Sequence, residues 1–129
     1  MQNKESLYAK DWFKKADNDL KAAEILFNAK NLASASFHIQ QAIEKYLKGY
    51  LLSKGWKLRR IHELDELLDE ALSHNPDFQK FRSLCEIATE YYIEDRYPLL
   101  ISSELNRDEL TAILKQTKEL VKFIMSSVK

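Results

Sequence analysis

Apolar residues recur every three or four positions along most of the chain, which is the spacing of helices with one buried face. The first such segment covers about residues 7–29 and the second about residues 32–54. A shorter segment covers about residues 63–73, and two longer ones follow at about residues 77–92 and 105–127. The pattern therefore predicts four long helices and one short helix.

The same spacing predicts which side chains form the core. On the first two helices these are Trp12, Ala16, Leu20, Ala23 and Phe27, followed by Leu32, Ala35, Ile39, Ile43, Tyr46, Leu47 and Tyr50. Residues that commonly cap helix N-termini precede three of the helices: Asn31, Asp77 and Asn106. Gly55 can adopt the left-handed conformation that ends a helix. Pro98 disfavours helical geometry at Tyr97, which predicts a connection over about residues 93–103.

The predicted connections are short, which favours an up-and-down antiparallel bundle in a single domain over residues 1–129. Composition agrees, because 2 Gly and 2 Pro in 129 residues are too few for the many turns of an all-β domain. Twenty basic and twenty acidic residues give a net charge of zero, which weighs against binding to long nucleic acids. The single cysteine, Cys85, and the lack of a long apolar run predict a cytoplasmic protein without membrane contact.

The usual signatures of catalysis and metal binding are absent from the sequence. The two glycines do not form a phosphate-binding loop, and one cysteine cannot build a thiolate zinc site. None of the three histidines has a glutamate three residues before it, which excludes the pattern of di-iron bundles. We therefore predict neither a metal nor a cofactor.

A second stripe on the second predicted helix is the first candidate for function. It consists of Phe37, Gln41, Glu44, Lys48 and Leu51, with Lys45 beside it. One interpretation is a solvated face carrying a pair of Glu44 and Lys48, which are four residues apart. The other is an interface or pocket wall, because polar groups here are framed by apolar ones.

A basic run is the second candidate. It consists of Lys54, Lys57, Arg59 and Arg60, followed by His62 at the predicted start of the short helix. A helix N-terminus can hold an anion, so this run could bind phosphate. The acidic residues Glu63, Asp65 and Glu66 follow directly and could neutralise it instead.

The third candidate is the segment from Tyr91 to Pro98, in which three tyrosines and an arginine precede a proline. Arg96 could hold a phosphate or a carboxylate, and Tyr92 or Tyr97 could stack on a base. Alternatively, Arg96 pairs with a neighbouring acid and the tyrosines belong to the core. Both interpretations remain open from the sequence.

Four stretches together resemble the HEPN domain (higher eukaryotes and prokaryotes nucleotide-binding). They are residues 16–23, 36–48, 62–64 and 96–98, and the most specific is Gln-Gln-Ala-x-Glu-Lys-x-x-Lys within the second of them. The resemblance implies an up-and-down helical bundle that commonly forms a homodimer. It also implies association with a small nucleotidyltransferase, often as a toxin–antitoxin pair, and the binding of a nucleotide.

Many members of that family are metal-independent ribonucleases with an Arg, four to six residues and then a His. After Arg96 the required window, residues 101–103, holds Ile, Ser and Ser, and no other arginine has a histidine at this distance. Serine cannot replace imidazole as a base near neutral pH. We therefore expect a non-catalytic binding protein whose contact residues are Gln41, Glu44, Lys45, Lys48, Arg96 and Tyr97.

Two other functions are compatible with the residues. The chain could be a ribonuclease whose histidine, His38 or His62, packs near Arg96 from elsewhere in the sequence. It could instead be a structural dimer or adaptor that uses the stripe from Phe37 to Leu51.

Overall fold

The structure is a computed structural model that describes residues 4–57, 63–96 and 106–128. Its helices are α1 (Lys4–Asn28), α2 (Leu32–Ser53), α3 (Leu64–Leu72), the 3₁₀ helix η1 (Pro76–Phe81), α4 (Arg82–Arg96) and α5 (Arg107–Ser127). Within the described ranges there is no strand, and α3 is the short α-helix. The predicted all-α bundle of four long helices and one short helix is therefore confirmed.

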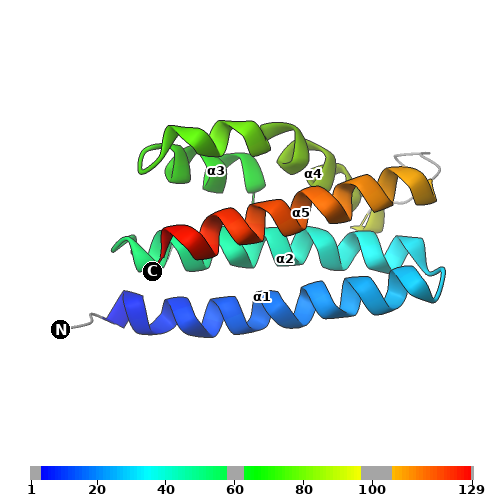
Figure 1. Ribbon diagram of the computed structural model, residues 1–129, viewed down its shortest axis with the longest axis horizontal. Coiled ribbons are helices and arrows are strands. Elements are labelled where there is room, and N and C mark those ends of the chain that lie inside the picture. The colour runs from blue at the N-terminus through cyan, green and yellow to red at the C-terminus, as the bar shows by residue number, and fades with distance from the viewer. Residues whose placement is uncertain (1–3, 58–62, 97–105, 129) are drawn as a thin grey trace.

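Helix α2 is the central element of the bundle. It packs against α1, α3, α4 and α5, whereas α1 packs chiefly against α2. In Figure 1, α1 and α4 run in one direction while α2 and α5 run in the other, and α3 and α4 form a layer above α2. The long helices therefore alternate in direction along the chain, as an up-and-down bundle requires.

The amino acids of α2 explain this position, because they are buried around most of the helix. The predicted core stripe is buried from Ala35 to Tyr50, and Leu32 is half-buried. Gln40, Glu44 and Lys48 are buried as well. A helix that is covered on several sides has to lie between other elements, and α2 does so.

The contact between α1 and α2 is close because a glycine lies in it. A Cβ atom placed on Gly49 would lie 2.6 Å from Cε1 of Phe13, closer than real Cβ contacts come. The Phe13 ring therefore occupies the space of the missing side chain. A few residues away, the Tyr46 hydroxyl on α2 donates a hydrogen bond to Asp17 on α1.

Most predicted helix ends are confirmed. The Asn31 side chain accepts from the Ser34 amide at 3.3 Å, and the Asn106 side chain accepts from the Asp108 amide at 2.7 Å. Gly55 follows α2 with a φ of +89°, in the left-handed region expected for it.

Two predicted boundaries are wrong. The cap before residue 76 is Asn75, whose side chain accepts from the Asp77 amide at 3.0 Å, and Pro76 fits the first helical position that follows. Helix α4 also continues to Arg96, beyond its predicted end near residue 92. The reason is that Pro98 restricts only the residue directly before it, and residues 93–96 contain no helix breaker.

The described helices include none with the length and apolar character needed to cross a membrane. Cys85 lies in the core on α4. Burial raises the pKa of its thiol to about 12, so this cysteine is protonated and is no candidate nucleophile.

Candidate functional site

Glu44 and Lys48 form a buried ion pair on α2. Lys48 Nζ donates to Glu44 Oε2 at 3.2 Å, and the side chains are only 3% and 8% exposed for Lys48 and Glu44 respectively. The predicted pair of residues four apart therefore forms. Its interpretation as part of a solvated face is wrong, because the bundle covers both side chains.

Helix α1 adds an aromatic ring to this pair. Lys48 Nζ lies 5.1 Å from the centre of the Trp12 ring, and Lys15 Nζ lies 5.4 Å from the same ring. The ammonium group of Lys48 is thus stabilised by a carboxylate and by the electrons of an indole. The sequence placed Trp12 on the core face of the first helix, and nothing in its spacing indicates that it would contact Lys48.

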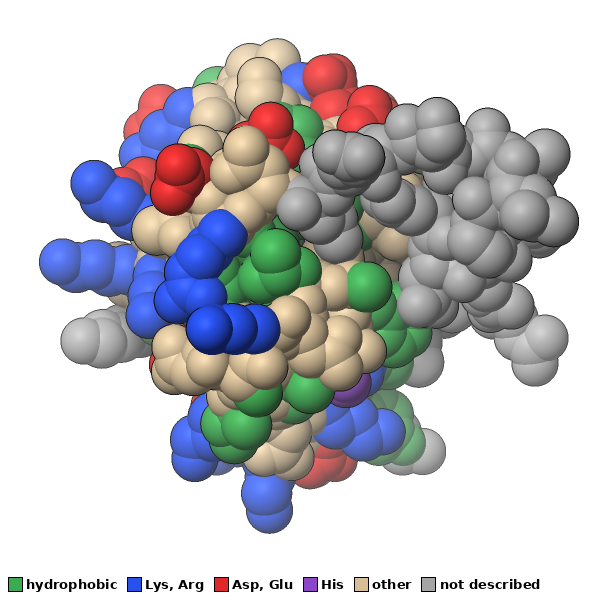
Figure 2. Space-filling model, turned by 90° about the vertical axis from the view of Figure 1, so that its right-hand side faces the viewer, with side chains coloured by type: hydrophobic (Ala, Val, Ile, Leu, Met, Phe, Trp, Pro, Cys, Tyr) green, Lys and Arg blue, Asp and Glu red, His purple; other side chains and the backbone are tan. Residues whose placement is uncertain are grey.

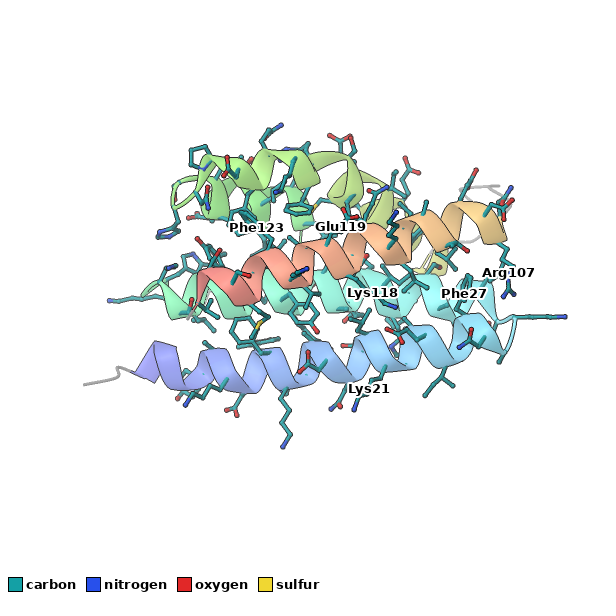
Figure 3. The ribbon with its side chains drawn as sticks, viewed as in Figure 1. Lys21, Phe27, Arg107, Lys118, Glu119 and Phe123 are labelled. Carbon is teal, nitrogen blue, oxygen red and sulfur yellow. The ribbon has the colours of Figure 1, made fainter. Side chains whose placement is uncertain are left out.

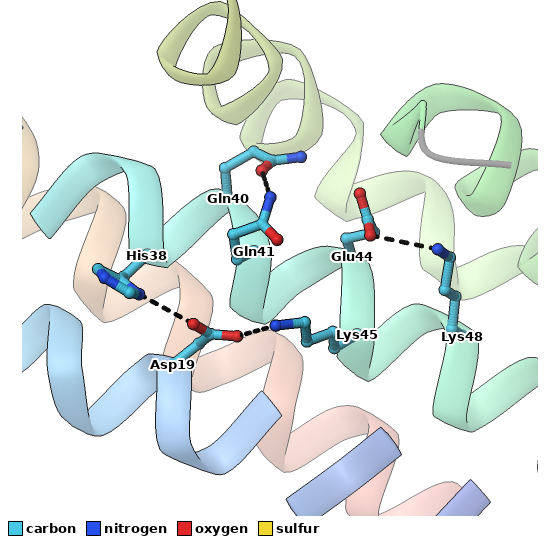
Figure 4. Close-up of polar contacts among 7 residues, drawn as sticks. All are labelled: Asp19, His38, Gln40, Gln41, Glu44, Lys45 and Lys48. Carbon is cyan, nitrogen blue, oxygen red and sulfur yellow. Dashed lines mark hydrogen bonds and ion pairs between the residues drawn. The ribbon is translucent and has the colours of Figure 1, made fainter. Parts of the chain in front are cut away.

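Lys45 belongs to a different cluster, at the contact between α1 and α2. Its Nζ donates to Asp19 Oδ2 at 2.5 Å, and His38 Nδ1 lies 2.9 Å from the other carboxylate oxygen of Asp19. Figure 4 shows Asp19 between His38 and Lys45, while Glu44 and Lys48 form their own pair. Asp19 therefore connects two residues of α2, a role that its place in the sequence does not indicate.

Gln41 is half-buried beside these groups. Its side-chain nitrogen donates to Oε1 of the buried Gln40 at 2.6 Å. At the ends of the stripe, Phe37 is half-buried with its ring 5.5 Å from that of His38, whereas Leu51 is completely buried. Leu51 therefore cannot contribute to an exposed adaptor surface, and this part of the adaptor hypothesis is wrong.

The remaining predicted contacts lie outside the described part of the molecule. Arg96 is the last residue of α4, but its side chain, like that of Tyr92, is not described, and Tyr97 and His62 lie outside the described residues. Any approach of His38 or His62 to Arg96 is therefore untested. Tyr91 is buried, as the core interpretation of the tyrosines predicted.

Two acidic residues of α3 contact α4: Asp65 near the start of the helix and Asp69 in its second half. Arg82 donates to Asp65 Oδ1 at 3.3 Å and to Asp69 Oδ1 at 2.5 Å. One arginine of α4 thus pairs with two carboxylates of α3 and neutralises them in part. Arg59 and Arg60 of the predicted basic run lie outside the described residues, so their pairing with these acids or with an anion is untested.

In the described ranges, no group of three or more His, Cys, Asp or Glu side chains is arranged to hold a metal ion. The polar stripe instead consists of paired groups at helix contacts.

The fold and the stripe define a helical-bundle protein with paired polar groups on its central helix. The HEPN domain family model matches residues 9–128, and the chain belongs to this family. The crystal structure of an archaeal HEPN homologue is similar, with a TM-score of 0.76 and 22% sequence identity over 94% of this chain and 98% of that chain. No curated protein matches the chain.

Proposed function

We propose that this HEPN protein is a binding module without ribonuclease activity, and that its ligand is a small nucleotidyltransferase, as in a toxin–antitoxin pair. The sequence supports the absence of cleavage, since no arginine has a histidine at the spacing of the family's ribonuclease motif. The protein would work as a homodimer. The chemistry of the pair would belong to the partner.

The observation that carries this proposal is the pairing of both lysines of the stripe with carboxylates. Lys45 binds Asp19 and Lys48 binds Glu44, so a phosphate at either ammonium group would have to compete with a carboxylate that is already in place. Side chains that are held in ion pairs lose little further entropy when a protein docks on them. This arrangement favours a protein partner over a free nucleotide.

Burial divides the predicted contact residues into two groups. Glu44 and Lys48 are too deeply buried to touch a partner, and we assign them the role of holding the stripe in shape. Gln41 and Lys45 are half-buried and can be reached from outside. They would contact the partner together with Arg96 and Tyr97.

The test begins with the neighbouring reading frame: where it encodes a minimal nucleotidyltransferase, the two proteins are co-expressed and analysed by size-exclusion chromatography. We expect a stable complex, and we expect Gln41→Arg to weaken it by about tenfold or more, since it places a bulky charge on the stripe. Gln116→Arg, on the exposed face of α5, is the matched control and should bind normally. Heat on titration with ATP, without any complex, would assign the stripe to a nucleotide instead.

A second arm tests the enzyme alternative. Purified protein incubated with RNA and a metal chelator should leave the RNA intact. Cleavage that disappears in His38→Ala would show that the histidine acts from an unexpected position, and the non-catalytic assignment would then be wrong.

A further inference from the structure

A separate groove lies between α1 and α5. It has a volume of about 350 Å³ and is lined by Glu24, Phe27, Asn28, Thr111, Leu114, Lys115 and Lys118. Both helices pack on α2, but they make few contacts with each other, so a groove is left between them. None of its residues belongs to the stripe on α2, and the groove is independent of the function proposed above.

The bottom of the groove is apolar. Phe27 is half-buried there and Leu114 is 8% exposed. The guanidinium of Arg107 lies 4.6 Å from the centre of the Phe27 ring, so a cation covers one end of this apolar surface. The space suits one or two apolar side chains of a ligand, with a positive charge beside them.

Cations predominate along the side of the groove that α5 forms. Arg107, Lys115, Lys118 and Lys122 are all exposed, and their spacing places them on one side of the helix. From Arg107 to Lys118 this side extends about 16 Å, or about three helical turns. Figure 3 shows Lys118 between α5 and α1, whereas Glu119 and Phe123 point to the other side of α5.

The only acidic residue lining the groove among those described is Glu24. Its carboxylate lies 3.4 Å from Lys118 Nζ, in a pair whose side chains are 43% and 56% exposed for Glu24 and Lys118. Such an exposed pair contributes little and can exchange partners readily. Figure 2, which looks at the end of the molecule where α5 begins, shows Lys and Arg side chains gathered on one side next to apolar atoms.

We propose that this groove binds an acidic amphipathic helix of a partner protein. One or two apolar side chains of that helix would pack on Phe27 and Leu114, and its carboxylates would pair with Arg107, Lys115 and Lys118. The charge complementarity is local, because the whole chain has a net charge of zero. RNA fits less well, since the bottom of the groove offers apolar contacts rather than hydrogen-bond donors for phosphates and base edges.

The experiment selects ligands from random sequences, so the partner protein itself is not needed. A random library of peptides of about 12 residues, long enough to follow the groove, is displayed on phage and panned against the full chain. We expect enriched sequences with several Asp or Glu and with apolar residues three or four positions apart. The best peptide is then synthesised, and its Kd is measured by fluorescence anisotropy.

Matched variants locate the binding. The double variant Lys115→Glu and Lys118→Glu should raise the Kd of the peptide by at least about tenfold. The control double variant, Lys57→Glu and Lys80→Glu, makes the same charge change elsewhere on the surface and should leave the Kd unchanged. Thr111→Trp fills the groove without a change of charge and should also weaken binding. Thermal unfolding verifies that each variant is folded.

Three results would overturn the proposal. One is a selection without acidic bias, and another is a peptide that binds equally to the groove variants and to the control pair. The third is displacement of the peptide by a uridine oligonucleotide or by a second copy of this chain, which would assign the groove to RNA or to self-association.

Discussion

Burial changes the energetic role of the Glu44–Lys48 pair. On a helix surface such a pair stabilises the fold by a few tenths of a kcal/mol. Here both groups have lost most of their contact with water, so their mutual attraction largely compensates for desolvation. Removal of one partner therefore lowers the free energy of unfolding by more than the intact pair contributes to it.

Replacement of Lys48 should show this asymmetry. We expect Lys48→Met to lower the free energy of unfolding by about 3 kcal/mol, because the buried Glu44 carboxylate loses the ammonium group that lies 3.2 Å from it. The double variant Glu44→Leu and Lys48→Met should recover most of that loss. Urea unfolding measures both, and equal losses in the single and double variants would contradict the assignment.

Because of Tyr46, the free energy of unfolding should depend on pH in the alkaline range. Burial and the adjacent Asp17 carboxylate raise the pKa of its phenol well above the usual range. In the unfolded chain the phenol ionises at about pH 10. The folded state therefore keeps its proton where the unfolded state loses it, so the stabilisation present below about pH 10 declines as the pH rises further.

Tyr46→Phe should reduce this dependence. We expect a loss of about 1.5 kcal/mol at neutral pH from the missing hydrogen bond to Asp17, and a smaller decline between about pH 8 and about pH 11 than in the parent protein. Urea unfolding at both pH values measures the free energy of unfolding of each protein. Tyr8→Phe is the control, because Tyr8 is 49% exposed and should leave the decline unchanged.

The sequence predicts contacts between residues of the same helix, but it does not predict contacts between residues of different helices. The Glu44–Lys48 pair was predictable because it lies within one helix, where spacing determines proximity. The Asp19–Lys45 pair was not, since it joins residues 26 positions apart on two helices whose register depends on packing. Burial of Glu44 and Lys48 was missed for the same reason: it depends on which elements cover that side of α2.

At the scale of elements, the approach of α1 to α2 depends on Gly49. In a helix, Ala is favoured over Gly by about 1 kcal/mol, so Gly49→Ala would be stabilising if space allowed it. The new Cβ would instead lie 2.6 Å and 2.7 Å from two ring atoms of Phe13. Overpacking of this kind costs about 1–3 kcal/mol, which outweighs the gain.

We therefore expect Gly49→Ala to destabilise the protein by about 1 kcal/mol net. In a Phe13→Leu background, where the ring is gone, the same substitution should be neutral or stabilising. Thermal and urea unfolding of the four proteins in this cycle measure the coupling. Equal effects of Gly49→Ala in both backgrounds would show that the Phe13 ring does not limit the approach of the helices.

Three helix ends were predictable because a single residue determines each of them, whereas the start of η1 was not, since its cap is Asn75 rather than Asp77. Asn31, Gly55 and Asn106 act through their own hydrogen bond or backbone conformation, and each lies where the pattern placed it. The C-terminal end of α4 was not predictable, because Pro98 disfavours helical geometry only at the preceding residue. The tyrosine-rich segment before it contains no residue that ends a helix.

For the whole molecule, the zero net charge conceals an uneven distribution. The acids of α3 collect on one element and are partly neutralised by Arg82, while the cations of α5 border the groove with α1. The fold class was predictable from periodicity, and the family from motifs in their order along the chain. The groove was not, because it depends on how far apart α1 and α5 lie on α2.

The three-residue connection between α1 and α2, residues 29–31, has a consequence for how the chain folds. The most extensive helix contact in the described molecule joins these two neighbours in sequence, so closing the loop between them costs little chain entropy. Such low contact order is typical of fast folding. The hairpin of α1 and α2 can thus form early and provide the surface on which α5, the last helix of the chain, completes the bundle.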